Sequence, residues 1–210
     1  MTVGILGSGA VGKALGRGFA SRGHTVLASS RVPDAPKHRQ WEAECEGDVA
    51  VVSFAKAAEA GDLLVLATAW EGTEDTIRAA GPEHFAGKVI LDATNPLDFS
   101  DGTPRLAVSE ASGTLVQRWL PGAHVVKAFN TVGAGLMVNP NLLGGPPSMF
   151  LAGDSAEAKA TAAEIARDFG WETFDLGGID RSAHLDHLAV IWILNAMAHG
   201  RERAFKVLSG

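Results

Sequence analysis

The chain has 210 residues, enough to bury one full hydrophobic core as a single domain or as a domain with an appendage. Its formal net charge of −6 argues against a basic surface for nucleic acid or anionic lipids, so we expect neither partner. The single cysteine, Cys45, excludes an intramolecular disulfide and fits a reducing cytoplasm. We expect no signal peptide, and the apolar run 188–198 is too short to span a bilayer.

The first stretch of the chain has the order of elements that a dinucleotide site needs. An apolar run at residues 3–6 is followed by Gly7, Gly9 and Gly12 in the spacing G-x-G-x-x-G, and then by a helix-like pattern. In such a site the first glycine permits a tight turn, the second admits a pyrophosphate and the third lets the helix pack closely. The alternative is an ordinary glycine-rich turn. We predict that the pyrophosphate is held at the helix N-terminus by Gly7, Ser8, Gly9, Ala10, Val11 and Gly12.

The end of the second predicted strand, residues 25–28, indicates which coenzyme binds. An NAD site usually has Asp or Glu there, which accepts hydrogen bonds from the ribose 2′-hydroxyl. Here Ser29, Ser30 and Arg31 follow the strand, and Lys37 lies close enough in sequence to add charge. Hydroxyls and a forked guanidinium suit a 2′-phosphate, so the sequence favours NADP(H). The alternative is a solvated basic loop.

Strands and helices alternate along the rest of the chain. Further strands are predicted at 48–52, 63–68, 89–91, 124–129, 149–152 and 172–175. Helices are predicted around Trp41 and at 54–60, 73–80, 112–120 and 155–169, with a mostly helical segment at 181–206. This alternation predicts an α/β fold, a Rossmann-like doubly wound and mostly parallel sheet. Residues 1–176 would form the NADP-binding domain, and 177–210 a short C-terminal helical extension that completes the acceptor site.

Polar or aromatic residues follow several predicted strands, at the edge where open α/β sheets bind ligands. Thr68, Ala69 and Trp70 end one strand, while Asn95 and Asn130 follow two others. We predict that Thr68, Trp70, Asn95 and Asn130 shape the nicotinamide and acceptor site. Packing is the alternative role for Trp70, and capping of its loop is the alternative for Asn95. Lys127, within a predicted strand, is interpreted as a snorkelling side chain.

The predicted C-terminal helix is apolar nearly all round, which is typical of a buried helix. It would close the crevice, form a dimer interface, or do both, and we predict a homodimer through residues 188–197. His184 and His187 have a spacing that a metal could use, but no third ligand is evident, so no metal site is predicted. The segment 133–147 is rich in glycine and proline and is interpreted as a long, mobile connection with one helical turn.

Several well-known catalytic arrangements are missing from the sequence. The chain has no tyrosine, which excludes the Tyr-x-x-x-Lys pair of short-chain dehydrogenases. The stretch after the last predicted strand is too short for the large helical domain of hydroxyacid or phosphogluconate dehydrogenases. We therefore predict no general acid or base, and a reaction that needs placement more than proton transfer, such as hydride exchange between two redox coenzymes.

The motifs ILGSGAVGKALGRGFASRGHTV, ASSR, LATAWEGTEDTI, KAFNTV and DLGGIDRSAHLDHLAVIW occur in this order along nearly the whole chain. Together they resemble the NADPH-dependent reductases of the deazaflavin coenzyme F420, a group to which the reductase domains of the STEAP metalloreductases are similar. The resemblance implies hydride transfer between NADPH and F420 or a flavin as co-substrate. It also implies that Ser8 is a side-chain donor in the glycine loop, that Ser30 and Arg31 bind the 2′-phosphate, and that residues 68–70 lie beside the nicotinamide ribose.

Two departures from the family pattern bear on the acceptor. Ala69 stands where family members often have proline, and the loop ATNP differs from that of the archaeal enzymes. The acidic tail of F420 would need basic residues near the crevice, for which Arg201, Arg203 and Lys206 are candidates. FMN, FAD and ferric ion are the alternative acceptors. The alternative function is an NADPH-binding redox sensor without turnover.

Overall fold

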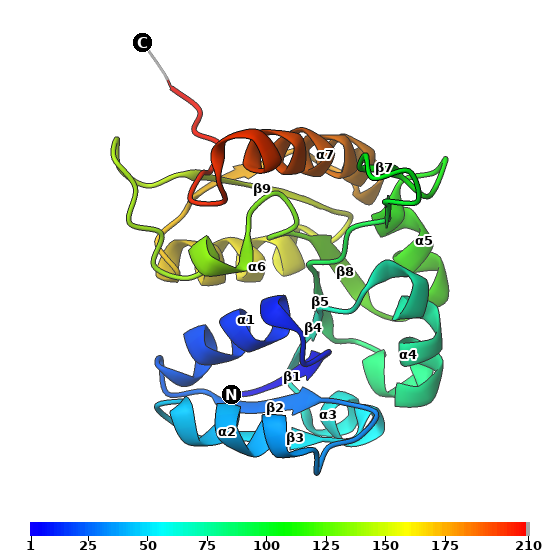
Figure 1. The fold of residues 1–210 in the computed structure, drawn as a ribbon. Coiled ribbons are helices and arrows are strands. Elements are labelled where there is room, and N and C mark those ends of the chain that lie inside the picture. Colours follow the sequence, from blue (N-terminus) through cyan, green and yellow to red (C-terminus); the bar gives the residue numbers. More distant parts are fainter. Residues whose placement is uncertain (209–210) are drawn as a thin grey trace.

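The computed structural model describes residues 1–208, in which helices cover both faces of an eight-stranded sheet (Figure 1). The strands of this sheet are β1 (Thr2–Leu6), β2 (Thr25–Ser29), β3 (Val49–Val52), β4 (Leu63–Leu66), β5 (Val89–Asp92), β8 (His124–Lys127), β9 (Ser148–Gly153) and β10 (Glu172–Asp175). The helices are α1 (Ala10–Ala20), α2 (Pro36–Glu44), α3 (Phe54–Ala60), α4 (Thr73–Ala80), α5 (Ser112–Trp119), α6 (Ala156–Asp168) and α7 (Ser182–His199). Short 3₁₀ turns are η1 (Trp70–Gly72), η2 (Pro82–Phe85), η3 (Ala134–Leu136) and η4 (Ile179–Arg181).

The strand order is β10-β9-β8-β5-β4-β1-β2-β3. All neighbours from β3 to β8 are parallel, β9 runs antiparallel to β8, and β10 is parallel to β9. The prediction of a doubly wound, mostly parallel sheet is therefore confirmed. The chain order reverses between β1 and β4, and open α/β sheets place ligands in the crevice at such a switch point.

Two apolar layers hold the helices on the sheet. On one face α1, α2 and α6 pack on the strands through side chains such as Phe19, Trp41 and Ile165. On the other face α3, α4 and α5 pack through Ile77, Val116 and their neighbours. Every side chain of β4 is buried, because helices remove both faces of this central strand from water. These layers fix the strand ends that carry the predicted site.

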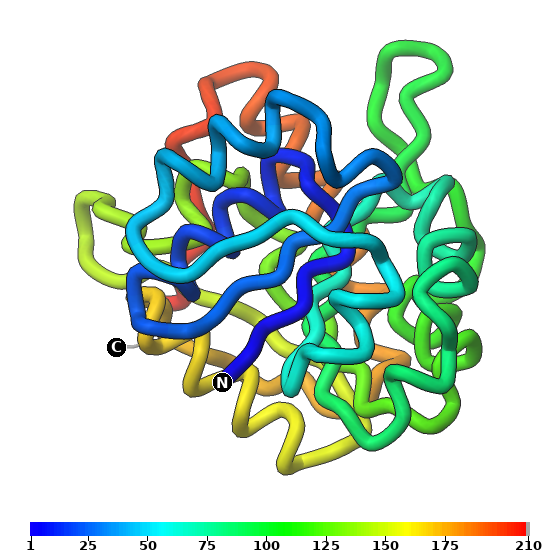
Figure 2. Tube along the Cα trace, turned by 90° about the horizontal axis from the view of Figure 1, so that it is seen from below, coloured from blue at the N-terminus to red at the C-terminus, as the bar shows by residue number. Residues whose placement is uncertain are grey.

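A small hairpin, β6 (Leu97–Asp98) with β7 (Arg105–Leu106), occupies a stretch that we predicted as loop. It protrudes from the body of the protein just after the end of β5 (Figure 2). Its strands are too short to carry an alternating apolar pattern, so the sequence gives little sign of them. The Asp98 carboxylate accepts hydrogen bonds from the backbone and side chain of Ser100, which fixes the turn.

The helical prediction for residues 181–206 is wrong at its C-terminal end. Helix α7 stops at His199, and Gly200 follows with a φ of +93°, a conformation that suits glycine at a helix end. The chain then runs back beside β9, where the Ser148 N–H donates to the Phe205 carbonyl at 2.9 Å. This pairing gives the backbone of the segment after Gly200 a partner in β9, and residues 201–206 form no further helix.

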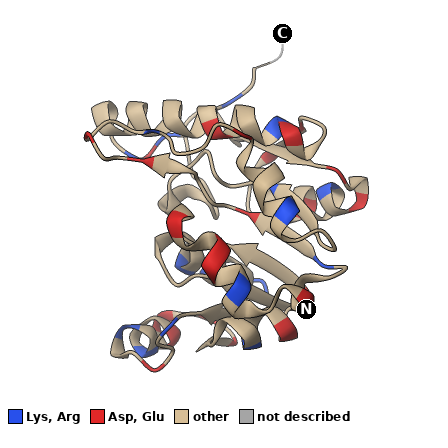
Figure 3. Ribbon diagram, turned by 90° about the vertical axis from the view of Figure 1, so that its right-hand side faces the viewer, with Lys and Arg blue, Asp and Glu red and all other residues tan. Residues whose placement is uncertain are grey.

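Helix α7 is buried on one side only, which corrects the prediction of a buried helix. Its inner face packs on α5 and β9, whereas Ile191, Leu194 and Met197 are 55, 46 and 63% exposed. Figure 3 shows this helix as almost free of charged residues. None of the helices in residues 1–208 has the length and hydropathy that a membrane crossing requires. The domain boundary after residue 176 stays a prediction, and residues 209–210 of the extension lie outside the described residues.

Candidate active site

The glycine loop lies between β1 and α1, at the switch point of the sheet. Gly7 has a φ of +126°, and a Cβ added to it would lie 2.5 Å from the Ala67 carbonyl oxygen. A Cβ on Gly12 would lie 2.3 Å from the Gly7 carbonyl oxygen. Both positions therefore need glycine for the tight turn and the close approach of α1. A Cβ on Gly9 would meet nothing within 4 Å, so the loop is open at the position where a pyrophosphate would approach.

The start of α1 offers backbone donors to an anion. Gly9 is the N-cap residue, and no side chain caps this end of the helix. The first N–H groups of an α-helix have no acceptor within the helix, and they carry its partial positive charge. Ser8 is half-buried, and Gly9 and Ala10 are exposed. This end of α1 can therefore bind a phosphate group through its backbone.

Ser29 does not face the coenzyme crevice, which corrects its predicted contact with a 2′-phosphate. Its side chain is fully buried, and its hydroxyl donates to the Ile5 carbonyl at 2.9 Å. The same hydroxyl accepts the Gly7 N–H at 3.3 Å. Successive side chains of a strand point to opposite faces, so Ser29 is directed inward and Ser30 outward. Ser29 therefore holds the end of β2 against the glycine loop.

The next residues form a small basic site that includes a histidine we did not single out. Nε2 of His38, at the start of α2, lies 3.1 Å from the hydroxyl of half-buried Ser30. His38 is fully buried, and this burial lowers its pKa below the ordinary 6.5, as do the charges of Lys37 and Lys13. Arg31 and Lys37 are exposed, and neither has an ion pair within residues 1–208. Both cations are therefore available to a phosphate.

At the end of β4, Thr68 places a half-buried hydroxyl beside the start of α4. Its hydroxyl lies 2.8 Å from the hydroxyl of Thr73, which in turn donates to the Ala69 carbonyl at 3.1 Å. The Trp70 ring packs on Trp119 of α5 at a centroid distance of 5.5 Å. Of the two interpretations of Trp70, the structure supports packing. Ala69, between Thr68 and Trp70, is exposed.

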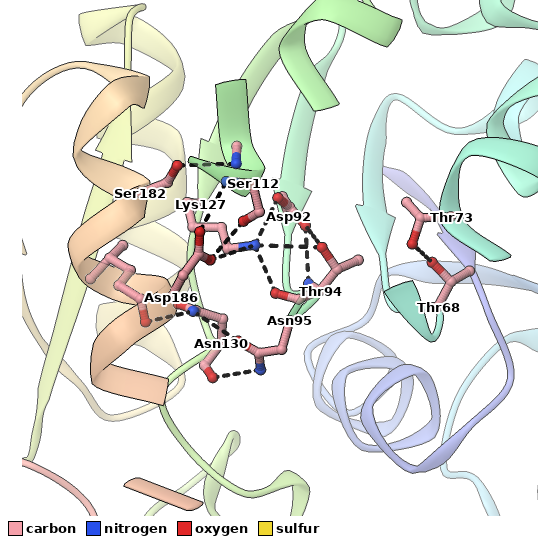
Figure 4. A network of polar contacts seen from close by, with 12 residues as sticks. Thr68, Thr73, Asp92, Thr94, Asn95, Ser112, Lys127, Asn130, Ser182 and Asp186 are labelled. Atoms are coloured by element: carbon pink, nitrogen blue, oxygen red, sulfur yellow. Dashed lines mark hydrogen bonds and ion pairs between the residues drawn. The ribbon is translucent and has the colours of Figure 1, made fainter. Parts of the chain in front are cut away.

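Asn95 and Asn130 lie at the ends of β5 and β8 and bond to each other (Figure 4). Asn95 Nδ2 donates to the Asn130 carbonyl at 2.8 Å, and Asn130 Nδ2 donates to Asn95 Oδ1 at 3.1 Å. Asn130 Nδ2 also donates to the Leu185 carbonyl of α7 at 3.1 Å. Asn130 Oδ1 is buried without a hydrogen-bond partner in residues 1–208. Phe129, just before it, has a φ of +61°, so the turn out of β8 is strained, as is common at functional sites.

Lys127 does not snorkel, which corrects its predicted role. Its side chain is fully buried, because β8 is covered on both faces and offers no route to water. It lies opposite Asp92 in the sheet register, and its Nζ is 3.0 Å from Asp92 Oδ2. Nζ also donates to the Thr94 carbonyl at 2.7 Å and lies 3.7 Å from Asp186 Oδ1. Sequence reasoning missed this network, because Asp186 comes from α7, far along the chain.

Helix α7 also supplies the caps of α5. The N-cap of α5 is Ala111, which has no side-chain acceptor. Asp186 accepts from the Ser112 N–H at 2.9 Å and from its hydroxyl at 2.6 Å, while the Ser182 hydroxyl accepts the Gly113 N–H at 3.0 Å. The sequence did contain a signal for these caps. Ala111 cannot cap the start of α5, and Ser182 and Asp186 are polar residues four apart on a mostly apolar helix. These bonds fix α7 over the edge of the sheet that carries Asn130.

The remaining predicted residues lie on or near α7. His184 and His187 are exposed, and His187 Nδ1 lies 2.7 Å from a backbone carbonyl of its own helix. In the described residues no group of His, Cys, Asp or Glu side chains could hold a metal ion. Arg201 is exposed, as are Arg203 and Lys206, and the Lys206 ammonium donates to the Pro146 carbonyl at 2.9 Å. Lys206 thus contacts the 133–147 connection.

Comparison with known proteins assigns the family. A family model described as NADP oxidoreductase, coenzyme F420-dependent, matches residues 2–96, from β1 to the loop after β5. A crystal structure of a candidate F420-dependent NADP reductase from Arthrobacter sp. FB24 is 35% identical, with a TM-score of 0.91 over 99% of both chains. The chain belongs to this F420-dependent NADP oxidoreductase family. The predicted resemblance is confirmed, and the protein is an NADP-dependent oxidoreductase.

Two proteins of lower sequence identity are also similar to this chain. Rat metalloreductase STEAP3 is 28% identical over 178 residues, which are 84% of this chain and 34% of STEAP3, so the chain spans about a third of that relative. A reductive aminase from Aspergillus terreus, solved with NADPH, is 20% identical with a TM-score of 0.67. The aligned region covers 94% of this chain and 61% of the aminase chain, and the similarity shows a shared fold alone.

Proposed function

We propose that the protein transfers a hydride between NADPH and a tricyclic redox coenzyme, the deazaflavin F420 or a flavin. Membership of the F420-dependent family supports this reaction class. The observation that carries the proposal is the chemistry of the strand ends. The polar side chains there, those of Thr68, Asn95 and the buried Asn130, do not titrate, whereas Asp92 and Lys127 are fully buried and paired with each other. Such a site suits a reaction that depends on placement rather than on proton transfer.

The residues of the chain fit NADP(H). Gly9 leaves open space beside the N-terminus of α1, where a pyrophosphate would meet free N–H groups. Ser30, Arg31 and Lys37 lie around the end of β2 and would hold the 2′-phosphate, with His38 behind the Ser30 hydroxyl. The reduced nicotinamide supplies the hydride when NADPH is bound. The role of the Asn95–Asn130 pair would be to hold its ring over the strand ends.

The acceptor would stack on the open side of the nicotinamide. Two segments are in contact beside this space, since a Cβ on Gly133 would lie 2.8 Å from the Trp192 ring of α7. The connection 133–147 and α7 would therefore form one wall. The exposed Arg201 and Arg203 lie just beyond the end of α7, where an acidic coenzyme tail would find positive charge. This arrangement favours a large, flat and anionic acceptor.

Metal reduction is the second candidate function. The observation that favours it is the similarity to STEAP3, which is named as a metalloreductase. A flavin could then carry electrons between NADPH and a ferric ion. The weaker identity and the partial coverage of that relative make F420 or a flavin the first choice.

Stopped-flow mixing tests the proposal directly. The protein saturated with NADPH is mixed separately with F420, FMN, FAD and a ferric chelate, and loss of the reduced nicotinamide absorbance is followed. We expect single-turnover oxidation with F420 or a flavin. Oxidation by the ferric chelate alone would support the metalloreductase instead. Tight NADPH binding with no oxidation by any acceptor would overturn the proposal and leave a redox sensor.

A further inference from the structure

We propose that Lys127 is a positioning residue for the nicotinamide site. Its buried ammonium fixes the loop that carries Asn95 and, through Asp186, the helix that bonds to Asn130 (Figure 4). The inference rests on the proposed function, because it assumes that this amide pair orients the nicotinamide. Lys127 itself has no exposed surface and would not touch the coenzyme.

One set of Lys127 contacts fixes the loop that carries Asn95. The Thr94 carbonyl, which accepts from Lys127 Nζ at 2.7 Å, belongs to the peptide plane that leads into Asn95. On its other side, the N–H and hydroxyl of Thr94 both donate to Asp92 Oδ1, at 3.0 and 2.6 Å. The residue before Asn95 is thus held at its nitrogen, its side chain and its carbonyl. Lys127 makes the carbonyl contact, and its Nζ also lies 3.4 Å from the Thr94 hydroxyl.

A second set of contacts runs from Lys127 through Asp186 and helix α7 to Asn130. Asp186 lies 3.7 Å from the Lys127 ammonium and is 1% exposed, and it anchors α7 to the start of α5. Leu185, the residue before it, presents its carbonyl to Asn130 Nδ2 at 3.1 Å. The position of α7 is therefore transmitted to the same amide that bonds Asn95. One buried cation joins β5, β8 and α7 at the point where their ends meet.

The charge balance of this cluster decides which variant is informative. One ammonium faces two carboxylates, and all three are buried. Replacement of Lys127 alone would leave both carboxylates uncompensated and would threaten folding. The double variant Asp92→Asn with Lys127→Met keeps the net charge of the cluster. Its amide oxygen can still accept from Thr94, so the variant loses the lysine contact with the carbonyl before Asn95 and the lysine pairing with Asp186.

The chain offers a matched control at the opposite edge of the sheet. Lys159 of α6 bonds to Asp175 Oδ1 at 2.8 Å and to the Gly177 carbonyl at 3.1 Å, so it has the same kinds of partner as Lys127. Asp175 ends β10, which runs against the direction of β8, so this pair lies away from the strand ends of the site. The control variant is Asp175→Asn with Lys159→Met.

The test compares these two variants with the wild-type protein. We expect the D92N/K127M variant to transfer hydride from NADPH to F420 about ten- to a hundredfold more slowly in single turnover, because small misplacements cost rates of that order. Its affinity for 2′,5′-ADP, which lacks the nicotinamide, should stay within about twofold of wild type, since distant sites behave independently. The D175N/K159M variant should keep both values. Wild-type transfer rates in D92N/K127M would overturn the proposal, as would a matching loss of 2′,5′-ADP affinity, which marks a general structural defect.

A second readout separates this inference from the proposed function. The fluorescence of bound NADPH reports the environment of its nicotinamide and needs no acceptor. We expect D92N/K127M to change this emission while the control variant does not. If the wild-type protein oxidises no NADPH, the proposed function fails and the emission alone decides the inference. Identical emission from all three proteins would then overturn it.

Discussion

Arg31 is the side chain on which a preference for NADPH over NADH should depend. It is exposed and has no ion pair within the described residues, so its guanidinium is free to meet a 2′-phosphate. A charge-assisted hydrogen bond contributes about 1.5–3 kcal/mol, so Arg31→Ala should weaken NADPH binding roughly ten- to a hundredfold. NADH affinity should hardly change. Titration calorimetry with both coenzymes measures the two constants.

Arg78 provides the control for this substitution. It is an exposed arginine on α4, paired with Glu74 of its own helix. Arg78→Ala should leave both affinities unchanged, because this side chain lies outside the β2 segment. An equal loss of NADPH and NADH affinity in Arg31→Ala would contradict the assignment of the 2′-phosphate site.

His38 should make stability depend on pH. Its folded-state pKa is lowered by burial first and by the charges of Lys37 and Lys13 second, while Glu42 opposes them. Because the unfolded chain binds the proton more readily, stability should fall as the pH drops below about 6.5. His38→Gln retains a donor toward Ser30 but does not titrate. Relative to this variant, the wild type should lose up to about 1.4 kcal/mol at a pH one unit below the ordinary value.

Urea unfolding at neutral pH and one unit below the ordinary histidine pKa checks this expectation. The comparison with the variant removes the contributions of the carboxylates, which both proteins share. A constant difference between the two proteins at both pH values would show that His38 keeps its ordinary pKa in the folded state. A rise in the relative stability of the wild type at low pH would show that protonated His38 is favoured.

At the scale of elements, we propose that α7 pairs with its copy in a homodimer. Three large apolar side chains, Ile191, Leu194 and Met197, are spaced three residues apart and are about half exposed. A stripe of this kind on an otherwise packed helix favours an isologous interface. Sedimentation at micromolar concentration should therefore give a dimer of the 21.8 kDa chain. The variant Ile191→Glu with Leu194→Glu should give a folded monomer.

Leu143 supplies the matched control for the dimer. It is the most exposed large apolar residue of the described chain and lies in the 133–147 connection, outside the sequence of α7. Leu143→Glu should sediment as the wild type does. A wild-type protein that sediments as a monomer at micromolar concentration would refute the interface.

At the scale of the whole molecule, the hydride step should depend weakly on pH. The polar side chains at the strand ends, those of Thr68, Asn95 and the buried Asn130, do not titrate, and the buried ion pair is closed to solvent. Single-turnover rates with saturating NADPH should therefore vary little across the neutral range. Asn95→Ala should lower the rate about ten- to a hundredfold through misplacement, with the same flat profile. A rate that follows a single titration in the wild type would reveal an acid or base that this site does not provide.

Much of the fold could be predicted from the sequence because its signals are local. The glycine spacing, the apolar runs of the strands and the helix stops are read within a few residues, and parallel strands end at one edge of the sheet. Because Asn95 and Asn130 each follow such a strand, this edge rule is sufficient to predict that they lie together. The antiparallel direction of β9 and the β6–β7 hairpin left no such local signal.

The corrections came where a side chain depends on a distant element. Ser29 and Ser30 are adjacent hydroxyls in the sequence, and only the packing of β2 against β1 turns one of them inward. Trp70 could have faced the crevice or packed within the fold, and Trp119 of α5 gives its half-buried ring a packing partner. Helix α7 is apolar nearly all round, yet one side stays exposed because the rest of the protein covers only its inner face.

Lys127 shows the difference between what the sequence determines and what only the tertiary structure decides. By itself the sequence determined that a lysine lies within the strand that became β8. Only the tertiary structure decided that this lysine is buried, because its partners come from β5 and from α7. A charge can leave water only where opposite charges and carbonyls replace its hydration, and that replacement is assembled by folding alone.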